Sequence, residues 1–586
     1  MTVLRVANAS GFYGDRFDAA REMVEGGAID VLTGDYLAEL TLMILQKDRR
    51  ADPSLGYAKT FPKQLRGVAA TCLDRGIKIV VNAGGLNPRG CADACRAVYA
   101  ELGLDAEVAH LEGDDLLPRL PELQAAGERF KHLDRGTPLS KLDHTVVSAN
   151  AYLGAWGIAE ALGRGADVVI CPRVTDAALV IGPAAWRFGW ARDRWDALAS
   201  ALVAGHIVEC GAQATGGNYS FFDRVDDLGH PGFPIAEIAA DGSFVVTKHP
   251  GTGGAVTVGT VTAQLLYEID GPRYRNPDVT ARFDTIRLES DGEDRVRVSG
   301  VQGEPPPTTT KVCLNYLGGF KNSVTFLLTG RHLEEKARII ESALFAALGG
   351  REDFQEVRTT LHRTAAGPGS GVSESFSFLT VAVKDPDRRK VDRRFSSAAV
   401  ELALASIPGF NLTAPPGSSR PFGVYWPALI DTAHLDVRLV FDGEEVSIEP
   451  TAGVDPESPV ASTSPADAHP SDFGDTVPAR LGRLVGARSG DKGGNANLGV
   501  WAESGDAFRW LDTFLTVDTL RELIPEARDL EVDRHRFPNL RALNFVLRGF
   551  LGDGVAASLA TDPQAKGLGE FLLAQVVDVP RRWLDA

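Results

Sequence analysis

The chain has little that would tie it to a membrane, to nucleic acid or to a disulfide framework. Its 586 residues contain no run of about 18 uncharged apolar residues, which a membrane-spanning helix requires. A formal net charge of −17 opposes the basic surface that nucleic acid or an anionic membrane demands. Six scattered cysteines predict reduced thiols, and no secretory signal opens the chain. We therefore expect a cytoplasmic protein with no nucleic-acid or membrane partner.

Motifs for several kinds of chemistry are also missing. The first glycine turn, GFYGD at 11–15, is not the G-x-G-x-x-G of a dinucleotide site, and no G-x-x-x-x-G-K-[ST] occurs. The segment GSGVSES at 369–375 lacks the closing glycine of a nucleophile elbow. There is no H-E-x-x-H and no paired C-x-x-C. These absences favour redox-neutral chemistry, without a metal site or a tightly bound redox cofactor.

The first part of the chain, to about residue 180, alternates short β-branched runs with helical patterns. Helices are predicted at Asp15–Val24 and Cys91–Leu102. This alternation predicts an α/β fold with right-handed crossovers and a mostly parallel, Rossmann-like sheet. The pattern fits an open doubly wound sheet or a closed barrel, and the irregular later units favour the open sheet. The predicted strands are Val3–Ala7, Ile29–Leu32, Ile77–Val81, Ala106–His110, Thr145–Val147 and Val168–Cys171.

Composition divides the chain into three parts. Residues 1–450 are predicted to form one large α/β domain with an α+β elaboration, and 205–230 is a candidate sub-boundary. Residues 451–480 are rich in Pro, Ser, Ala and Asp and nearly free of large apolar groups, which predicts a flexible linker. Residues 481–586 are predicted to fold as a small α+β domain.

Polar and glycine-containing turns follow four of the predicted strands. Because the carboxyl ends of parallel strands share one edge, we expect these turns to line one crevice. Asp35, Glu39 and Asp176 are candidate general acids or bases there. Helix capping by Asp35, Thr175 or Asp176, and simple turn formation by the glycines, are the structural alternatives. The candidate anion-binding residues are Asn8, Ser10, Asn82, Gly84, Gly85, Asn87, Arg173 and Thr175.

Three glycine-rich segments, 209–218, 248–259 and 367–375, form a second set of candidates. Glycine lets backbone N–H groups approach an anion closely. HPGTGG at 249–254 precedes a predicted helix or strand, so it is a candidate phosphate cradle with His249 as a further acid or base. Ordinary loop flexibility is the alternative, and for Cys210 an inert buried thiol is favoured over a nucleophile. The anion-binding candidates here are Gly216, Gly217, Asn218, Thr252, Gly253 and Gly254.

The segment ARSGDKGGNANLG at 487–499 concentrates basic, amide and glycine residues between two predicted strands. Arg488, Ser489, Lys492 and Asn495 would suit a carboxylate or phosphate in a long loop. The alternative is an internal ion pair between Arg488 and Asp491 that stiffens the loop.

These segments carry a resemblance to a known family. VANASGFYGDR at 6–16, VVNAGGLNP at 80–88, ICPRVTDAALVIGP at 170–183 and the segment at 487–499 resemble the acyclic terpene utilisation (AtuA-type) family, in the expected order. The resemblance implies a large AtuA-type domain, a small ferredoxin-like domain, and a role in catabolism of citronellol- and geraniol-derived acids as acyl-CoA thioesters. It supplies no catalytic residue set.

Two functions fit these expectations. One is a redox-neutral enzyme of lyase or hydratase type, acting on a branched acyl-CoA or its carboxylic acid, which needs an acid or base and an oxyanion stabiliser. The other is a non-catalytic acyl-CoA-binding or scaffold subunit, which needs only the anion site. Either way the expected partner is a small anionic molecule, coenzyme A enters only as part of it, and we expect a homo-oligomer.

Overall fold

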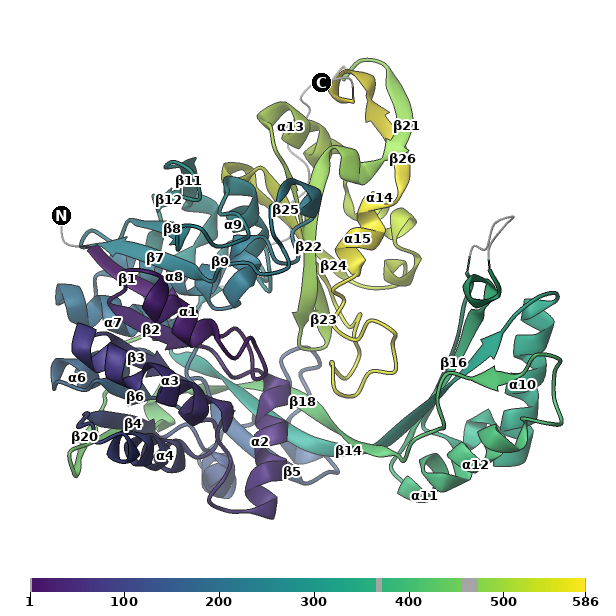
Figure 1. Ribbon diagram of the computed structural model, residues 1–586, viewed down its shortest axis with the longest axis horizontal. Helices are drawn as coiled ribbons and strands as arrows, with labels where there is room; N and C mark the ends of the chain where they lie inside the picture. Colours follow the sequence, from purple (N-terminus) through teal and green to yellow (C-terminus); the bar gives the residue numbers. More distant parts are fainter. Residues whose placement is uncertain (1–2, 365–370, 456–472, 585–586) are drawn as a thin grey trace.

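The computed structural model describes residues 3–364, 371–455 and 473–584. Figure 1 shows an α/β body, a lobe that projects from it, and a C-terminal α+β domain that rises between the two. No helix within the described ranges is long and apolar enough to cross a membrane.

The body is built on an eleven-stranded sheet with a parallel centre. The five central strands, in spatial order, are β1 (Val3–Asn8), β2 (Val31–Gly34), β3 (Lys78–Val81), β6 (Val168–Ile170) and β4 (Val108–Glu112). Beyond β1 lie β7 (Pro234–Ala239), β8 (Phe244–Lys248), β12 (Val296–Ser299) and β11 (Arg287–Ser290), and beyond β4 lie β19 (Arg438–Phe441) and β20 (Glu444–Ser447).

The prediction of a mostly parallel sheet is therefore not confirmed. All six neighbour pairs outside the centre are antiparallel, against four parallel pairs within it. The added strands come from residues 234–299 and 438–447, where turn residues indicate strands but not their partners. The strand predicted at Thr145–Val147 is β5 (Val146–Ala151), which leaves this sheet and pairs antiparallel with β14 (Thr309–Leu328).

Helices cover both faces of the central strands because successive strand residues point to opposite faces. Val6 and Val31 pack into one core beneath α6 (Trp156–Gly163), α7 (Ala178–Phe188) and α8 (Trp195–Val208). Ala7 and Leu32 pack into a second core beneath α1 (Ala19–Gly26), α3 (Thr60–Arg75) and α4 (Pro88–Glu101). Residues from both sides of the candidate sub-boundary near 205–230 share the first core.

A second sheet joins the body to the lobe. The first half of β14 pairs with β5 in the body, and its second half pairs with β16 (Ser377–Asp385) in the lobe. The strand β18 (Arg420–Asp431) runs beside β14, while β15 (Glu356–His362) and β17 (Asn411–Leu412) complete the sheet. The lobe has its own core beneath α10 (Leu333–Leu348) and α12 (Arg393–Glu401), and α10 is capped by Gly349 in the left-handed conformation, with φ +91°.

The C-terminal domain is a four-stranded antiparallel sheet in the order β22 (Val485–Lys492), β23 (Asn495–Ala502), β25 (Ala542–Leu547) and β24 (Val532–Phe537). Helices α13 (Gly505–Phe514), α14 (Val517–Leu523) and α15 (Leu568–Leu573) share its core. Of the predicted linker, residues 456–472 lie outside the described residues, and its last five residues form β21 (Thr476–Arg480), paired with β26 (Val576–Pro580).

The prediction of a long loop between β22 and β23 is wrong. Both strands run through the segment, and only Gly493 and Gly494 remain as the hairpin turn, with Lys492 opposite Asn495. Small and polar residues have low strand propensity, so these strand ends cannot be recognised from the sequence. The polar side chains instead face neighbouring parts of the body.

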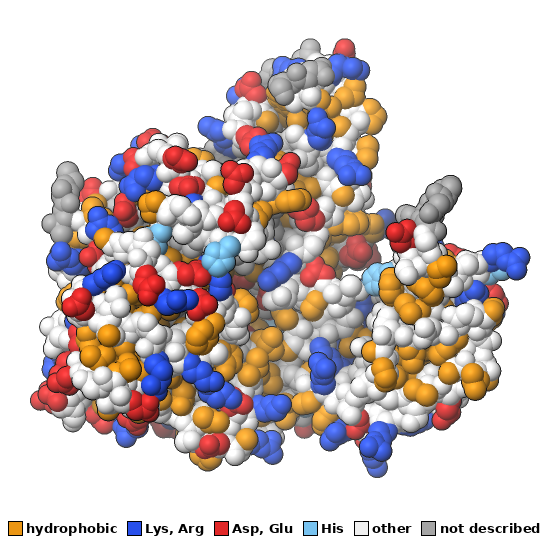
Figure 2. Space-filling view, viewed as in Figure 1, with side chains coloured by type: hydrophobic (Ala, Val, Ile, Leu, Met, Phe, Trp, Pro, Cys, Tyr) orange, Lys and Arg blue, Asp and Glu red, His pale blue; other side chains and the backbone are white. Residues whose placement is uncertain are grey.

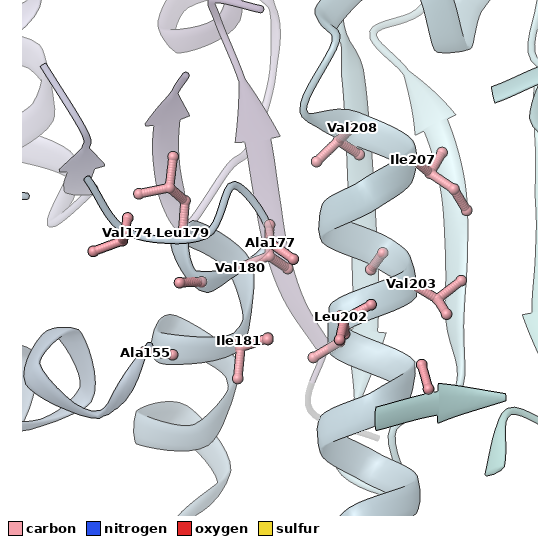
Figure 3. Packing of buried hydrophobic residues seen from close by; sticks show 14 of the residues in the cluster. Ala155, Val174, Ala177, Leu179, Val180, Ile181, Leu202, Val203, Ile207 and Val208 are labelled. Carbon is pink, nitrogen blue, oxygen red and sulfur yellow. The ribbon is translucent and has the colours of Figure 1, made fainter. Parts of the chain in front are cut away.

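A close approach of two helices positions the region where the site is found. Figure 3 shows Leu202, Val203 and Ile207 of α8 beside the start of α7. A Cβ added at Gly205 would lie 2.6 Å from the Ala177 Cα, so only glycine allows this packing. The contact holds the end of α8 next to the turn that follows β6.

Gly205→Ala should lower the free energy of unfolding by about 1–3 kcal/mol, because the added methyl forces α7 and α8 apart. Gly67→Ala is the matched control in α3, where no atom lies within 4 Å of the added Cβ, and it should stabilise by about 0.5–1 kcal/mol. Thermal unfolding followed by calorimetry measures both changes. Equal effects of the two substitutions would contradict the packing described.

Candidate functional site

The turns after β1, β2, β3 and β6 form a rim at the carboxyl ends of the parallel strands. Figure 2 shows a hollow between the body, the C-terminal domain and the lobe. Arg173, after β6, is buried at 3% exposure, and its Nη1 donates to Asp176 Oδ1 at 2.5 Å. The guanidinium carbon lies 4.0 Å from the centre of the Tyr152 ring. The rim thus contains one buried cation fixed from two sides.

Glu39, the first residue of α2 (Glu39–Ala51), lies next to this cation. Its Oε1 accepts a hydrogen bond from the Tyr152 hydroxyl at 2.7 Å and lies 3.3 Å from Lys311 Nζ. Burial raises the pKa of Glu39, but attraction to Lys311 and Arg173 outweighs it, and the pKa falls to about 2. Glu39 is therefore a carboxylate at neutral pH.

Asp35, after β2, has the opposite electrostatic environment. Its Oδ1 accepts hydrogen bonds from Asn82 Nδ2 at 2.6 Å and from the Leu37 amide at 3.0 Å. Burial and then repulsion from Asp176 raise the pKa of Asp35 well above its ordinary value. Two carboxyl groups of the same connection between β2 and α2 therefore have pKa values shifted in opposite directions.

Two further carboxyl groups enter from the ends of other helices. Glu209 follows α8, and burial together with repulsion from Asp176 raises its pKa well above the ordinary range. Glu268 follows α9 (Val258–Leu265), and burial raises its pKa despite attraction to Lys492. The backbone of Glu268 is left-handed, with φ +59°, a conformation that non-glycine residues adopt at a cost. We call Asp35, Glu39, Asp176, Glu209, Glu268 and Asp491 the acid cluster.

The C-terminal domain closes the acid cluster with the end of β22. Lys492 Nζ donates to the Glu268 carbonyl at 2.5 Å, and Asn497 Oδ1 accepts from the Glu268 amide at 2.8 Å. Burial and repulsion from Glu268 raise the pKa of Asp491 to about 8. Arg488 donates to Gln213 Oε1 and stacks 4.3 Å above the Tyr267 ring. The alternative Arg488–Asp491 ion pair is not formed.

Several predicted anion-binding residues instead hold the turns in place. Asn8 Nδ2 donates to the Val208 carbonyl at 2.6 Å, and Asn87 Oδ1 caps α4 by accepting from the Gly90 amide at 2.9 Å. A Cβ at Gly84 would lie 2.6 Å from the Cys171 carbonyl oxygen, and Gly85 has φ +52°. Ser10 Oγ donates to the Phe12 carbonyl at 3.1 Å.

Two members of the predicted set on β22 and β23 also have structural roles. Ser489 Oγ accepts from the Gly569 amide at 2.8 Å, which holds α15 against β22 within the small domain. Asn495 Nδ2 donates to Asp134 Oδ1 at 2.7 Å. Asn495 is buried, so this bond stabilises the docking of the small domain on the body.

Arg173 and Thr175 retain unused hydrogen-bonding capacity. Arg173 Nε and the Thr175 hydroxyl are buried and have no hydrogen-bond partner among the described residues. A buried donor without a partner costs free energy, and a ligand oxygen could satisfy it.

The HPGTGG segment lies apart from the acid cluster. His249 Nε2 lies 2.8 Å from the Met23 carbonyl oxygen, and its ring packs against Gly26 and Gly27. Lys248 and His249 border a cavity of about 590 Å³, but Lys248 Nζ is already paired with Asp294 at 2.8 Å.

The glycines of these loops mainly permit backbone contacts. A Cβ at Gly253 would lie 2.3 Å from the Asp227 carbonyl oxygen. Gly254 donates its amide to Asp226, and Gly216 and Gly217 donate to Gln213 and Ala212. Thr252 Oγ1 donates to the His249 carbonyl at 2.7 Å. In the third glycine-rich segment, residues 367–370 lie outside the described residues.

Sequence reasoning missed four groups that the structure adds: Tyr152, Lys311, Glu268 and Tyr267. Lys311 and Tyr152 come from β14 and from the end of β5, which carry no turn or glycine signal. In the sequence, Glu209 is noticed only as the neighbour of Cys210. Burial and the charge of Glu209 raise the pKa of the Cys210 thiol, which is consistent with an inert thiol.

No group of three or more His, Cys, Asp or Glu residues in the described ranges is arranged to hold a metal ion. Homo-oligomerisation stays a prediction.

Asp491→Asn should make thermal stability less dependent on pH. A carboxyl whose pKa is raised on folding stabilises the folded state below its unfolded pKa, and this contribution is lost as pH rises toward about 8. The melting temperature of the unmodified protein should fall more between pH 5 and 8.5 than that of Asp491→Asn, with roughly 1 °C for each kcal/mol in a chain of 586 residues. Asp518→Asn, at a 92% exposed side chain, is the control and should leave the profile unchanged. An unaltered profile for Asp491→Asn would contradict the assignment.

Comparison with known proteins agrees with the resemblance seen in the sequence. Residues 4–441 match the family described as "Acyclic terpene utilisation family protein AtuA", and residues 479–578 match the "AtuA ferredoxin-like domain". No curated protein matches the chain. The first match covers well over half of the 586 residues, and family membership implies a part in acyclic terpene utilisation. The chain belongs to the acyclic terpene utilisation family and carries its ferredoxin-like domain.

Proposed function

We propose that the protein is a redox-neutral enzyme of lyase or hydratase type that acts on a branched acyl-CoA thioester or on its carboxylic acid. The proposal rests on the opposite electrostatic environments of the carboxyl groups in the acid cluster. The pKa of Glu39 is lowered to about 2, whereas burial raises those of Asp35 and Glu209 well above their ordinary values. Groups with opposite shifts in one site are typical of acid–base catalysis.

Such an enzyme must also stabilise the negative charge that develops on an oxygen of the substrate. Arg173 and Thr175 are the donors that would do this. Arg173 Nε and the Thr175 hydroxyl are buried donors without partners among the described residues, and they belong to the same turn. A thioester carbonyl or a carboxylate placed there would accept from both. As a thioester enolate forms, its oxygen gains charge and these bonds strengthen, which lowers the barrier.

The carboxyl groups supply proton transfer. Asp176 is 31% exposed and close enough to Asp35, Glu209 and Glu268 to raise the pKa of each. We assign Asp176 as the base that removes the proton next to the thioester carbonyl. Glu209, whose pKa is raised by burial, donates a proton to the β-oxygen, which leaves as water. His249 has no part in this scheme because it packs against α1.

Glu209→Gln should lower kcat about 10²–10⁴-fold on the substrate that is found, since the proton donor is removed while the shape of the site is kept. A panel of branched acyl-CoA thioesters and free isoprenoid acids, assayed in both directions by mass spectrometry, provides the measurement. Glu122→Gln, at a 69% exposed side chain on the body, is the control and should retain full activity.

Ligand-induced thermal stabilisation should persist in Glu209→Gln and be lost in Arg173→Met. Binding by the unmodified protein without turnover of any panel member would contradict an enzyme and indicate a non-catalytic acyl-CoA-binding subunit. Full activity of Glu209→Gln would exclude that residue as the proton donor.

A further inference from the structure

A cavity of about 400 Å³ lies where the C-terminal domain meets the body. One wall is the loop from Asn218 to Leu228, and the other is formed by β22 and the segment from Lys566 to Glu570. The walls are joined through Ser220, whose Oγ donates to the Ala487 carbonyl at 2.6 Å and accepts from the Ala487 amide at 2.9 Å. The volume is within the range of small-molecule sites.

The wall on the C-terminal domain is cationic. Arg488 is 6% exposed, and Gln213 Oε1 accepts from one of its two terminal nitrogens. Lys566 is exposed at the rim and forms no ion pair with any carboxylate in the described part of the chain. Glu570 adds one carboxylate, so the lining carries more positive than negative charge. Such a surface, within a chain of net charge −17, suits a phosphate group.

The opposite wall is aromatic. Phe222 is 62% exposed, which is unusual for so large an apolar side chain, and it borders the cavity beside Tyr219. The Tyr219 ring is itself fixed by stacking on Trp501, with centroids 6.0 Å apart and planes 16° from parallel. A flat heterocycle can stack on such a wall while its phosphates reach the cations across the cavity.

The cavity is connected to the acid cluster through β22. Arg488 borders the cavity and stacks on Tyr267, the neighbour of Glu268. Asp491 lies three residues further along the same strand, about 10 Å away at the usual rise per residue. A ligand anchored at the cavity can therefore extend toward the acid cluster.

We propose that this cavity binds the phosphorylated adenosine group of a coenzyme A thioester, with the purine against Phe222 and a phosphate between Arg488 and Lys566. The inference rests on the proposed function for its choice of coenzyme A over a free nucleotide. It assigns Phe222 and Lys566 as binding residues that lie outside the acid cluster.

Calorimetric titration with adenosine 3′,5′-bisphosphate tests the proposal without catalysis. The bisphosphate should bind, and adenosine or inorganic phosphate alone should bind at least 10-fold more weakly. Lys566→Ala and Phe222→Ala should each weaken bisphosphate binding about 10-fold or more. Phe222→Tyr keeps the ring and should retain binding, and Lys141→Ala, at an exposed lysine elsewhere on the body, is the charge control.

Absence of bisphosphate binding, or equal affinity in all variants, would overturn the proposal. If ATP binds more tightly than both the bisphosphate and coenzyme A, the adenosine group that the cavity binds does not belong to coenzyme A. Turnover of a free acid without bisphosphate binding would contradict the assignment of this cavity but not the proposed enzymatic function. Bisphosphate binding that depends on Phe222 and Lys566, without any turnover, would support the cavity assignment and contradict the enzyme.

Discussion

The site depends on one buried cation, Arg173. Removing a guanidinium from water costs several kcal/mol unless partners replace the lost hydration. Here Asp176 accepts its hydrogen bond, and Tyr152 covers its face. Tyr152 in turn donates to Glu39, which also pairs with Lys311. Four elements, β6, β5, α2 and β14, must therefore meet in one arrangement, and the junction of the two body sheets is fixed at this point.

The acid cluster follows from the same burial. Five carboxyl groups besides Glu39 share too few cations for all of them to ionise in a site from which much of the water is excluded. Lys311 and Arg173 lower the pKa of Glu39, whereas burial raises the pKa values of Asp35, Glu209 and Glu268. The C-terminal domain contributes to this balance, since Lys492 lowers and Asp491 raises the local negative charge. Docking of that domain and protonation of the cluster are thus linked.

The sequence predicts the parallel centre of the body and the turns of the rim, because local periodicity and strand direction determine both. Asp35 comes from one predicted turn and Arg173 with Asp176 from another, and the structure places the two turns together. Long-range pairing could not be predicted in the same way. Lys311 enters from the first half of a 20-residue strand, and this half pairs with β5 and β18, each more than a hundred residues away in the sequence. The polar ends of β22 and β23 resemble a loop because their side chains satisfy contacts across a domain boundary.

The most direct test of the account is infrared difference spectroscopy of the carboxyl groups at pH 6. A protonated carboxylic acid has a carbonyl band that an ionised carboxylate lacks. Burial of Asp35 and Glu209 predicts such bands in the unmodified protein at this pH, with defined parts lost in Asp35→Asn and in Glu209→Gln. A spectrum with no protonated carboxyl band, or with bands unaffected by both substitutions, would contradict it.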